Sequence, residues 1–510
     1  MTAVAPLARP GRPARVLRLE IRRSVVPWAI PLIAALFFFD SFRTAAGFAP
    51  VWTVRSSVIT SNMMTDFGPF AAGLAAWGAS REGRRHIGDL LATTVRPAWA
   101  RQAAALGGTL FWLLLTFLIG IAALYIDTAR QATWGGPPVW PVVVGLVEVI
   151  TFAVIGFAVG ALFPGRFAAP LAAIGTFVLA YVGFHAASGV KPRTGTYALL
   201  SPATAVPLGD AGVFYHVAPD VSIVQVMFMG GICVALAAVV VLAPLCRISY
   251  RRIRSVASRA SGWLWVAGAV LLAAGVAASS TAYALAGTAK LSMSGWDIPA
   301  LHDAASDQPV PYTPDCAGTS FTVCLHPAFS RYLRDVNAAL QPVAAQIAGL
   351  PGAPVRAEQV ASGSGVRSVQ GLRVAGTPAT GITGTPPVYN ISSEDPIAPL
   401  WGTGAMLAIS GWGAGFAQEF LTAYVAPPNT FMPSPAQQAV VTALMTAAGV
   451  GAPQFPQAFN GNGTPVGASQ AQIGAAASRF EALSPAARRA WLATHVPALR
   501  AGNITLAQLP

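Results

Sequence analysis

The most prominent pattern along the chain is a series of apolar runs in its first half. Most of these runs approach or exceed the roughly 20 apolar residues that an α-helix needs to cross a bilayer. The first is short and contains Pro27 and Pro31, so its limits are the least defined. The pattern predicts about seven transmembrane helices, at residues 25–39, 58–78, 103–126, 140–163, 168–187, 222–245 and 263–286.

Beyond residue 288 the pattern becomes that of a soluble domain. Segments 327–350 and 484–499 have helical periodicity, and Ser484 followed by Pro485 is typical of an N-cap and first helical residue. Residues 366–390 are punctuated by Gly, Thr and Pro, which is typical of strands and turns. The expected fold is an α-helical polytopic membrane protein followed by a mixed α+β domain.

The chain divides into four expected regions. The tail contains an amphipathic segment in which Val16, Leu17, Leu19 and Ile21 alternate with arginines. Such a segment lies in the membrane interface, although ordinary basic flanking of a first span is the alternative. The regions are a cytoplasmic tail with this helix (1–24), a six-span membrane domain (25–254), a basic linker with the seventh span (255–288) and an extracytoplasmic domain (289–510).

Composition and charge support the membrane assignment. Only 10% of the 510 residues are charged, against about 25% in a typical soluble domain. Up to residue 288 the chain has 22 Lys/Arg and 9 Asp/Glu, whereas the remainder has 10 of each. The excess positive charge therefore belongs to membrane loops and does not indicate nucleic-acid binding. Alternate loops hold 17 and 5 basic residues, which predicts a cell-membrane protein with a cytoplasmic N-terminus and an outer C-terminal domain.

Four cysteines fit this topology. Cys316 and Cys324 lie in the outer domain, where an oxidising environment permits a disulfide between them, with two free thiols as the alternative. Cys233 and Cys246 lie in or beside the sixth span and are expected to be buried, unreactive thiols.

The loop between the second and third spans has the most informative sequence. If residues 80–94 form a helix, Ile87, Leu90 and Leu91 share one stripe, with Glu82 and Asp89 elsewhere around it. A short amphipathic helix of this kind can occupy a groove in a partner protein.

This segment resembles the coupling helix of type-2 ABC transporter permeases, which are exporter-like membrane subunits. The resemblance rests on Glu82, Gly88 and the run 89–93, and the six-span plan extends it over about residues 12–254. It implies an exporter powered by a separate cytosolic ABC ATPase. It also implies a permease that is a homo- or heterodimer in contact with membrane lipid. The seventh span and the outer domain depart from the family plan.

Motifs for catalysis are absent from the sequence. No G-x-x-x-x-G-K-[ST] loop occurs, so ATP is expected on the partner subunit and no cofactor on this chain. No H-E-x-x-H or G-x-S-x-G motif occurs either, so we expect neither a metal site nor an enzyme. His326 is expected to serve as a local turn or cap.

Two carboxylates fall inside predicted spans. Asp66 and Glu148 each lie about eight residues from the outer end of a span, roughly 12 Å deep. An ionisable group at that depth is a functional candidate, and a hydrogen-bonded structural acid is the alternative. The sequence thus favours an ABC exporter permease over a membrane-anchored binding or sensory protein without transport activity, because a simple anchor needs neither these acids nor the loop.

The predicted topology can be tested by labelling single cysteines in intact cells. A membrane-impermeant thiol reagent should modify Gly461→Cys, in the outer domain, and should spare Arg84→Cys on the cytoplasmic side. The opposite pattern of labelling would overturn both the topology and the compartment expected for the disulfide.

Overall fold

The structure is a computed structural model of the chain. It describes residues 13–47, 49–56, 67–85, 98–188, 199, 211–216, 219–251, 259–291, 296–302, 309–360, 381–392, 412–427, 433–451, 453, 455, 458–459 and 465–510.

Long helices make up the first half of the chain. They are preceded by the amphipathic helix α1 (Pro13–Arg23), whose last turn is basic. The helices that follow are α2 (Val26–Leu36), a π-helical turn η1 (Phe37–Phe42), α3 (Arg43–Gly47), α5 (Gly68–Ala79), α6 (Arg81–Arg84), α8 (Ala98–Gln131), α9 (Trp140–Leu162), α10 (Ala168–Ser188), α12 (Ala211–Phe214), α13 (Asp220–Arg251) and α14 (Arg259–Ala286).

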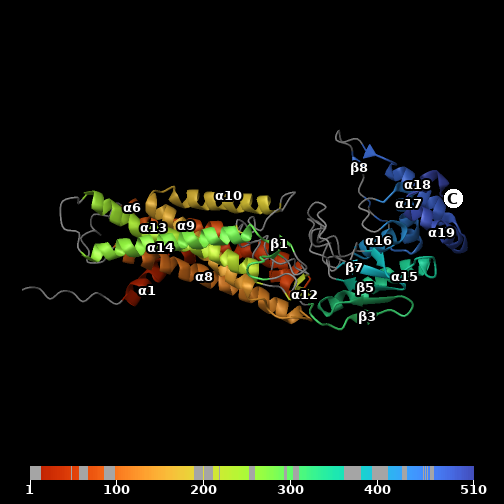
Figure 1. The fold of residues 1–510 in the computed structure, drawn as a ribbon, viewed down its shortest axis with the longest axis horizontal. Helices are drawn as coiled ribbons and strands as arrows, with labels where there is room; N and C mark the ends of the chain where they lie inside the picture. Colours follow the sequence, from red (N-terminus) through yellow and green to blue (C-terminus); the bar gives the residue numbers. More distant parts are fainter. Residues whose placement is uncertain are drawn as a thin grey trace, which may run out of the picture.

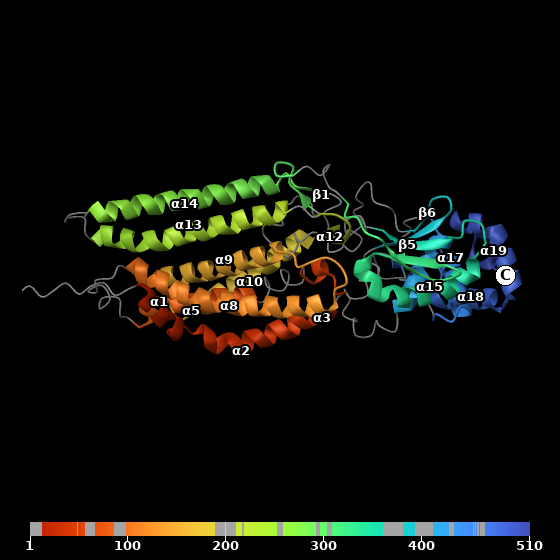
Figure 2. The same cartoon turned by 90° about the horizontal axis from the view of Figure 1, so that it is seen from below.

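These helices form an elongated bundle with the C-terminal domain beyond one end and α1 and α6 at the other (Figure 1). Helix α9 is central, because it packs against α5, α8, α10 and α13. Helix α14 packs mainly on α13, and Figure 2 shows the two running side by side along one edge of the bundle. Two-residue strands β1 (Lys290–Leu291) and β2 (Trp296–Asp297) follow α14 at the end nearest the C-terminal domain.

Glycines allow the closest helix pairs to form. A Cβ on Gly156 or Gly160 of α9 would lie only 1.9 or 2.3 Å from the carbonyl oxygens of Ala72 and Ala76 in α5. The two contacts are four residues apart on both helices, so α5 and α9 run parallel with Gly-x-x-x-Gly packing. Lipid supplies no hydrophobic force between helices, and this close van der Waals contact takes its place.

Five helices in the described part of the chain are long and apolar enough to cross a membrane. They span Val26–Gly47, Ala98–Gln131, Trp140–Leu162, Asp220–Val240 and Trp265–Ala286. A shorter apolar helix, Ala168–Val182, lies within α10, and α5 covers the second half of the expected second span. The apolar helices agree with the expected membrane protein, while the count of seven stays a prediction.

The C-terminal domain contains a five-stranded mixed sheet and helices. The sheet order is β3-β4-β5-β7-β6, with β4, β5 and β7 parallel and both edge strands antiparallel. Its elements are β3 (Asp315–Ala317), β4 (Thr322–Leu325), η5 (Pro327–Tyr332), α15 (Leu333–Ile347), β5 (Arg356–Val360), β6 (Gly381–Thr383), β7 (Val388–Ser392), α16 (Trp412–Val425), α17 (Pro435–Ala447), β8 (Ala458–Phe459), β9 (Pro465–Val466), α18 (Gln470–Ala482), α19 (Pro485–Arg500) and η7 (Leu506–Gln508).

Two expectations for this domain are confirmed. Ser484 is the N-cap of α19 and accepts a hydrogen bond from the Ala487 amide, with Pro485 at the first helical position. Cys316 and Cys324 face each other on antiparallel β3 and β4 and form a disulfide. A disulfide indicates an oxidising compartment for this domain.

The glycine packing of α13 against α14 provides a matched test. A Cβ on Gly231 would lie 2.6 Å from the Gly275 carbonyl oxygen and 2.8 Å from the Ser279 amide nitrogen, whereas one on Gly230 meets nothing within 4 Å. Gly231→Ala should therefore destabilise the protein by about 1–3 kcal/mol, the usual cost of overpacking. Gly230→Ala should be neutral or slightly stabilising.

Thermal unfolding of the purified protein in detergent measures this difference. Equal melting temperatures for the two variants would contradict the close approach of α13 and α14.

Candidate functional site

The amphipathic helix α1 is attached to the long apolar helix α8. Trp112 of α8 donates a hydrogen bond from its indole Nε1 to the Ile21 carbonyl oxygen at 2.8 Å. A Cβ on Gly108 would lie 2.9 Å from the backbone carbon of Glu20, so α1 lies directly against α8 at this point. The two helices therefore form one unit at the end of the bundle that is far from the C-terminal domain.

The short helix α6 is joined to the same unit by two ion pairs. Arg81 Nη2 lies 3.0 Å from both carboxylate oxygens of Glu20 in α1. Glu82, a predicted coupling residue, accepts a hydrogen bond from Arg101 Nε of α8 at 3.3 Å. A Cβ on Gly83 would lie 2.3 Å from the Pro164 side chain, so α6 also rests on the turn between α9 and α10.

The structure describes only part of the predicted coupling segment. Glu82 is placed in α6 with the partner just described. The remaining coupling candidates and the intramembrane acid of the second span lie outside the described residues, namely Ile87, Asp89, Leu90, Leu91 and Asp66. Sequence reasoning did not identify Arg81 or Trp112 as connecting residues. The sequence offered only a basic loop as a signal for Arg81, and Trp112 lies in the middle of an apolar run, where nothing distinguishes it.

The second intramembrane acid, Glu148, is deeply buried in α9. Its side chain is 1% exposed, and neither carboxylate oxygen has a hydrogen-bond partner within the part of the chain that the structure describes. One turn further along α9, Phe152 packs against the start of α5 at Gly68. A buried carboxyl group without a partner is costly, which is why such a position is a functional candidate.

The other end of α8 contacts the C-terminal domain. Thr133, just beyond the helix, donates a hydrogen bond to the Pro327 carbonyl oxygen at 2.6 Å. Gln131 accepts hydrogen bonds from Arg331 of the C-terminal domain at 3.4 Å and from Arg55 at 3.1 Å. Arg55 is 2% exposed and pairs with Asp127 at 3.0 Å. One helix therefore contacts α1 and α6 at one end and the C-terminal domain at the other.

His326 lies in an aromatic cluster at this junction. Its ring centre is 4.1 Å from that of Tyr312, 5.0 Å from Phe214 and 5.1 Å from Trp134. As expected, it is a cap: the side chain is at the N-terminus of η5, where Nδ1 accepts a hydrogen bond from the Ala328 amide at 3.1 Å. The ring is completely buried, and this burial lowers the pKa of His326 to about 4.

Comparison of the chain with protein-family models, curated proteins and solved structures finds no match in any of the three. The residues that the structure describes include no group of three or more His, Cys, Asp or Glu side chains able to hold a metal ion. The structure by itself shows a bundle of apolar helices in which α8 contacts α1 and α6 at one end and the C-terminal domain at the other.

The His326 cluster makes the junction sensitive to acid. The folded pKa of about 4 lies below the ordinary value of 6.5, so the unfolded chain takes up the proton first as the pH falls. The histidine's contribution to stability is complete above pH 6.5 and is lost progressively between pH 6.5 and 4. Between pH 8 and pH 5 the loss should be about 2 kcal/mol.

His326→Asn provides the control for this effect. Asparagine can still accept the Ala328 hydrogen bond as a cap, but it does not titrate. The melting temperature of wild type should fall more than that of the variant on going from pH 8 to pH 5. An identical fall in both proteins would show that the histidine does not cause it.

Proposed function

We propose that this protein is the membrane-spanning permease subunit of an ABC transporter, acting as an exporter with a separate cytosolic ATPase. The observation that carries the proposal is the attachment of α1 and α6 to α8. These are the elements that the resemblance marks as the interfacial helix, the start of the coupling segment and the third span. In this assignment the end of the bundle that bears them faces the cytoplasm.

The geometry supports a mechanical role for this unit. In the proposed mechanism the ATPase closes on nucleotide and pushes the coupling segment, which includes Glu82. The Glu82–Arg101 and Arg81–Glu20 contacts would transfer that push to α8 and α1 together. Because α8 is a continuous helix of 34 residues, its tilt would also displace the residues that touch the C-terminal domain.

The alternative is a membrane-anchored protein without transport activity, in which the C-terminal domain has the binding or sensory function. Its spans would serve only as an anchor. That role leaves the buried Glu148 and the paired Glu82 without a purpose, and we therefore favour the permease.

Replacement of Leu90 and Leu91 with Ser tests the proposal. If they anchor the coupling segment in an ATPase groove, each truncation should cost on the order of 2 kcal/mol, or roughly 30-fold in affinity. The full-length protein is purified in mild detergent and probed with a photoreactive ATP analogue. A labelled nucleotide-binding subunit should co-purify with wild type and should be absent from the purified Leu90→Ser/Leu91→Ser variant.

Val139→Ser is the matched control. Val139 is 68% exposed and lies at the other end of the bundle, just before α9, so its truncation should leave the subunit bound. Wild-type protein that recovers no labelled subunit would contradict the permease assignment and favour the anchored domain.

A further inference from the structure

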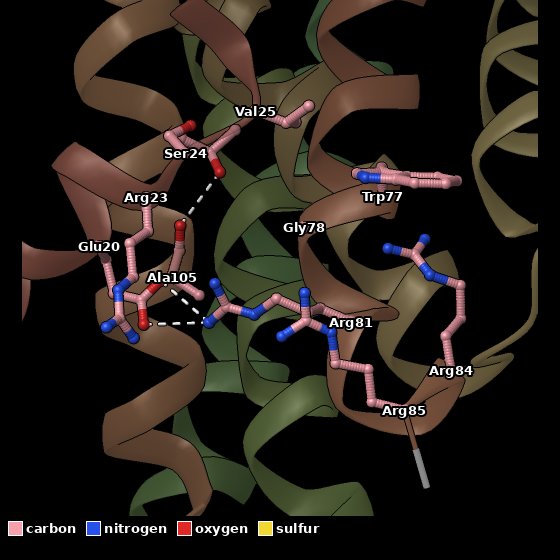
Figure 3. A pocket seen from close by; sticks show the side chains of 11 residues that line it. Glu20, Arg23, Ser24, Val25, Trp77, Gly78, Arg81, Arg84, Arg85 and Ala105 are labelled. Atoms are coloured by element: carbon pink, nitrogen blue, oxygen red, sulfur yellow. Dashed lines mark hydrogen bonds and ion pairs between the residues drawn. The ribbon is translucent and has the colours of Figure 1, made fainter. Parts of the chain in front are cut away.

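A basic cavity lies between α1, α5, α6 and α8, at the end of the bundle far from the C-terminal domain (Figure 3). It has a volume of about 320 Å³. Among the described residues that line it, four are arginines and one, Glu20, is an acid. The arginines come from two separate elements, with Arg23 on α1 and Arg81, Arg84 and Arg85 at or beside α6.

The charges within the cavity do not cancel. Both carboxylate oxygens of Glu20 are engaged by Arg81 at 3.0 Å, so the one acid among the described lining residues is already paired. Arg23 and Arg85 are exposed, and none of the side chains that the structure describes forms an ion pair with either of them. Among the lining residues that the structure describes, four arginines and one glutamate leave an excess of three positive charges for an anion to neutralise.

Arg84 is affected by the neighbouring positive charges. Partial burial lowers its pKa from the ordinary value, and the neighbouring charges of Arg85 and Arg81 lower it further. The guanidinium group is nevertheless held in place, because it lies 3.5 Å from the ring centre of Trp77 and donates a hydrogen bond to Ser80 Oγ at 2.8 Å. A positioned guanidinium group is well suited to bind phosphate oxygens.

Apolar surface adjoins the charged cavity. Trp77 lines the cavity, lies over Arg84 in Figure 3 and is 43% exposed. Tryptophan is enriched at the boundary between headgroups and acyl chains. A soluble anion needs only the arginines, whereas a lipid would use the arginines for its headgroup and this apolar surface for its chains.

We propose that this cavity binds the phosphate group of an anionic phospholipid from the adjoining leaflet. The phosphate lies among the guanidinium groups of α1 and α6, and the acyl chains extend along Trp77. Basic cavities between membrane helices bind lipid headgroups in this way. A bound headgroup also connects α1 to α6, in addition to the Glu20–Arg81 ion pair. The site does not depend on whether the protein is a transporter.

Native mass spectrometry of the full-length protein in neutral detergent tests the proposal. The probes are phosphatidylglycerol, phosphatidylcholine with the same acyl chains, and inorganic phosphate. The test variant is Arg23→Gln/Arg85→Gln, which leaves the Glu20–Arg81 and Glu82–Arg101 pairs intact. The control variant, Arg18→Gln/Arg166→Gln, removes two exposed arginines from the same end of the bundle but outside the cavity.

Wild type and the control variant should bind phosphatidylglycerol in preference to phosphatidylcholine. The test variant should bind phosphatidylglycerol about 30-fold more weakly, since each arginine near the headgroup contributes about 5-fold. Its melting temperature without lipid should match that of the control variant.

Three results would overturn the proposal. Equal weakening in both variants would assign the effect to overall surface charge. Undiminished binding in the test variant would place the lipid elsewhere. Binding of inorganic phosphate as tight as that of phosphatidylglycerol would make the cavity a site for a free phosphate anion.

Discussion

The continuity of α8 is the constraint on which the rest of the structure depends. At 1.5 Å per residue its 34 residues extend for about 51 Å, well beyond the ~30 Å hydrocarbon core. Both ends therefore emerge into polar surroundings, where side chains can form hydrogen bonds and ion pairs. One end holds Glu82 through Arg101, and the other holds the C-terminal domain through Thr133. A rigid helix with fixed contacts at both ends couples two regions that are far apart in sequence.

Small residues determine how the other helices pack on one another. Gly156 and Gly160 bring α9 against α5, and Gly231 together with Gly275 brings α13 against α14. In a lipid solvent these close backbone contacts provide the association that apolar burial provides in water. The buried Glu148 lies two turns before Gly156, so one helix contains both tight packing contacts and a costly carboxyl group.

Charge is concentrated at the end of the bundle where α1 and α6 meet. Arginines are expected beside a bilayer, but their arrangement here is specific: some are paired with Glu20 and Glu82, and others surround a cavity. The C-terminal junction is different, because His326 is held neutral among aromatic rings. The two ends of α8 thus differ: one has arginine–carboxylate pairs beside a basic cavity, and the other has a buried, neutral histidine near the Arg55–Asp127 ion pair.

Sequence patterns were sufficient for features with a local cause. Apolar runs indicated membrane helices because the bilayer requires about 20 apolar residues in a row. Ser484 before Pro485 indicated a helix start, and spacing together with compartment indicated the Cys316–Cys324 disulfide. Five of the described helices meet this requirement, and the count of about seven stays a prediction.

Only the tertiary structure decided which residues meet across long separations. The Glu20–Arg81 pair joins positions 61 residues apart, and the Thr133–Pro327 hydrogen bond joins positions 194 apart. No periodicity encodes such contacts, because they depend on how helices pack and which rotamers that packing allows. The basic cavity has the same origin: each arginine looked like ordinary flanking charge until α1 folded back against α8 and faced α6.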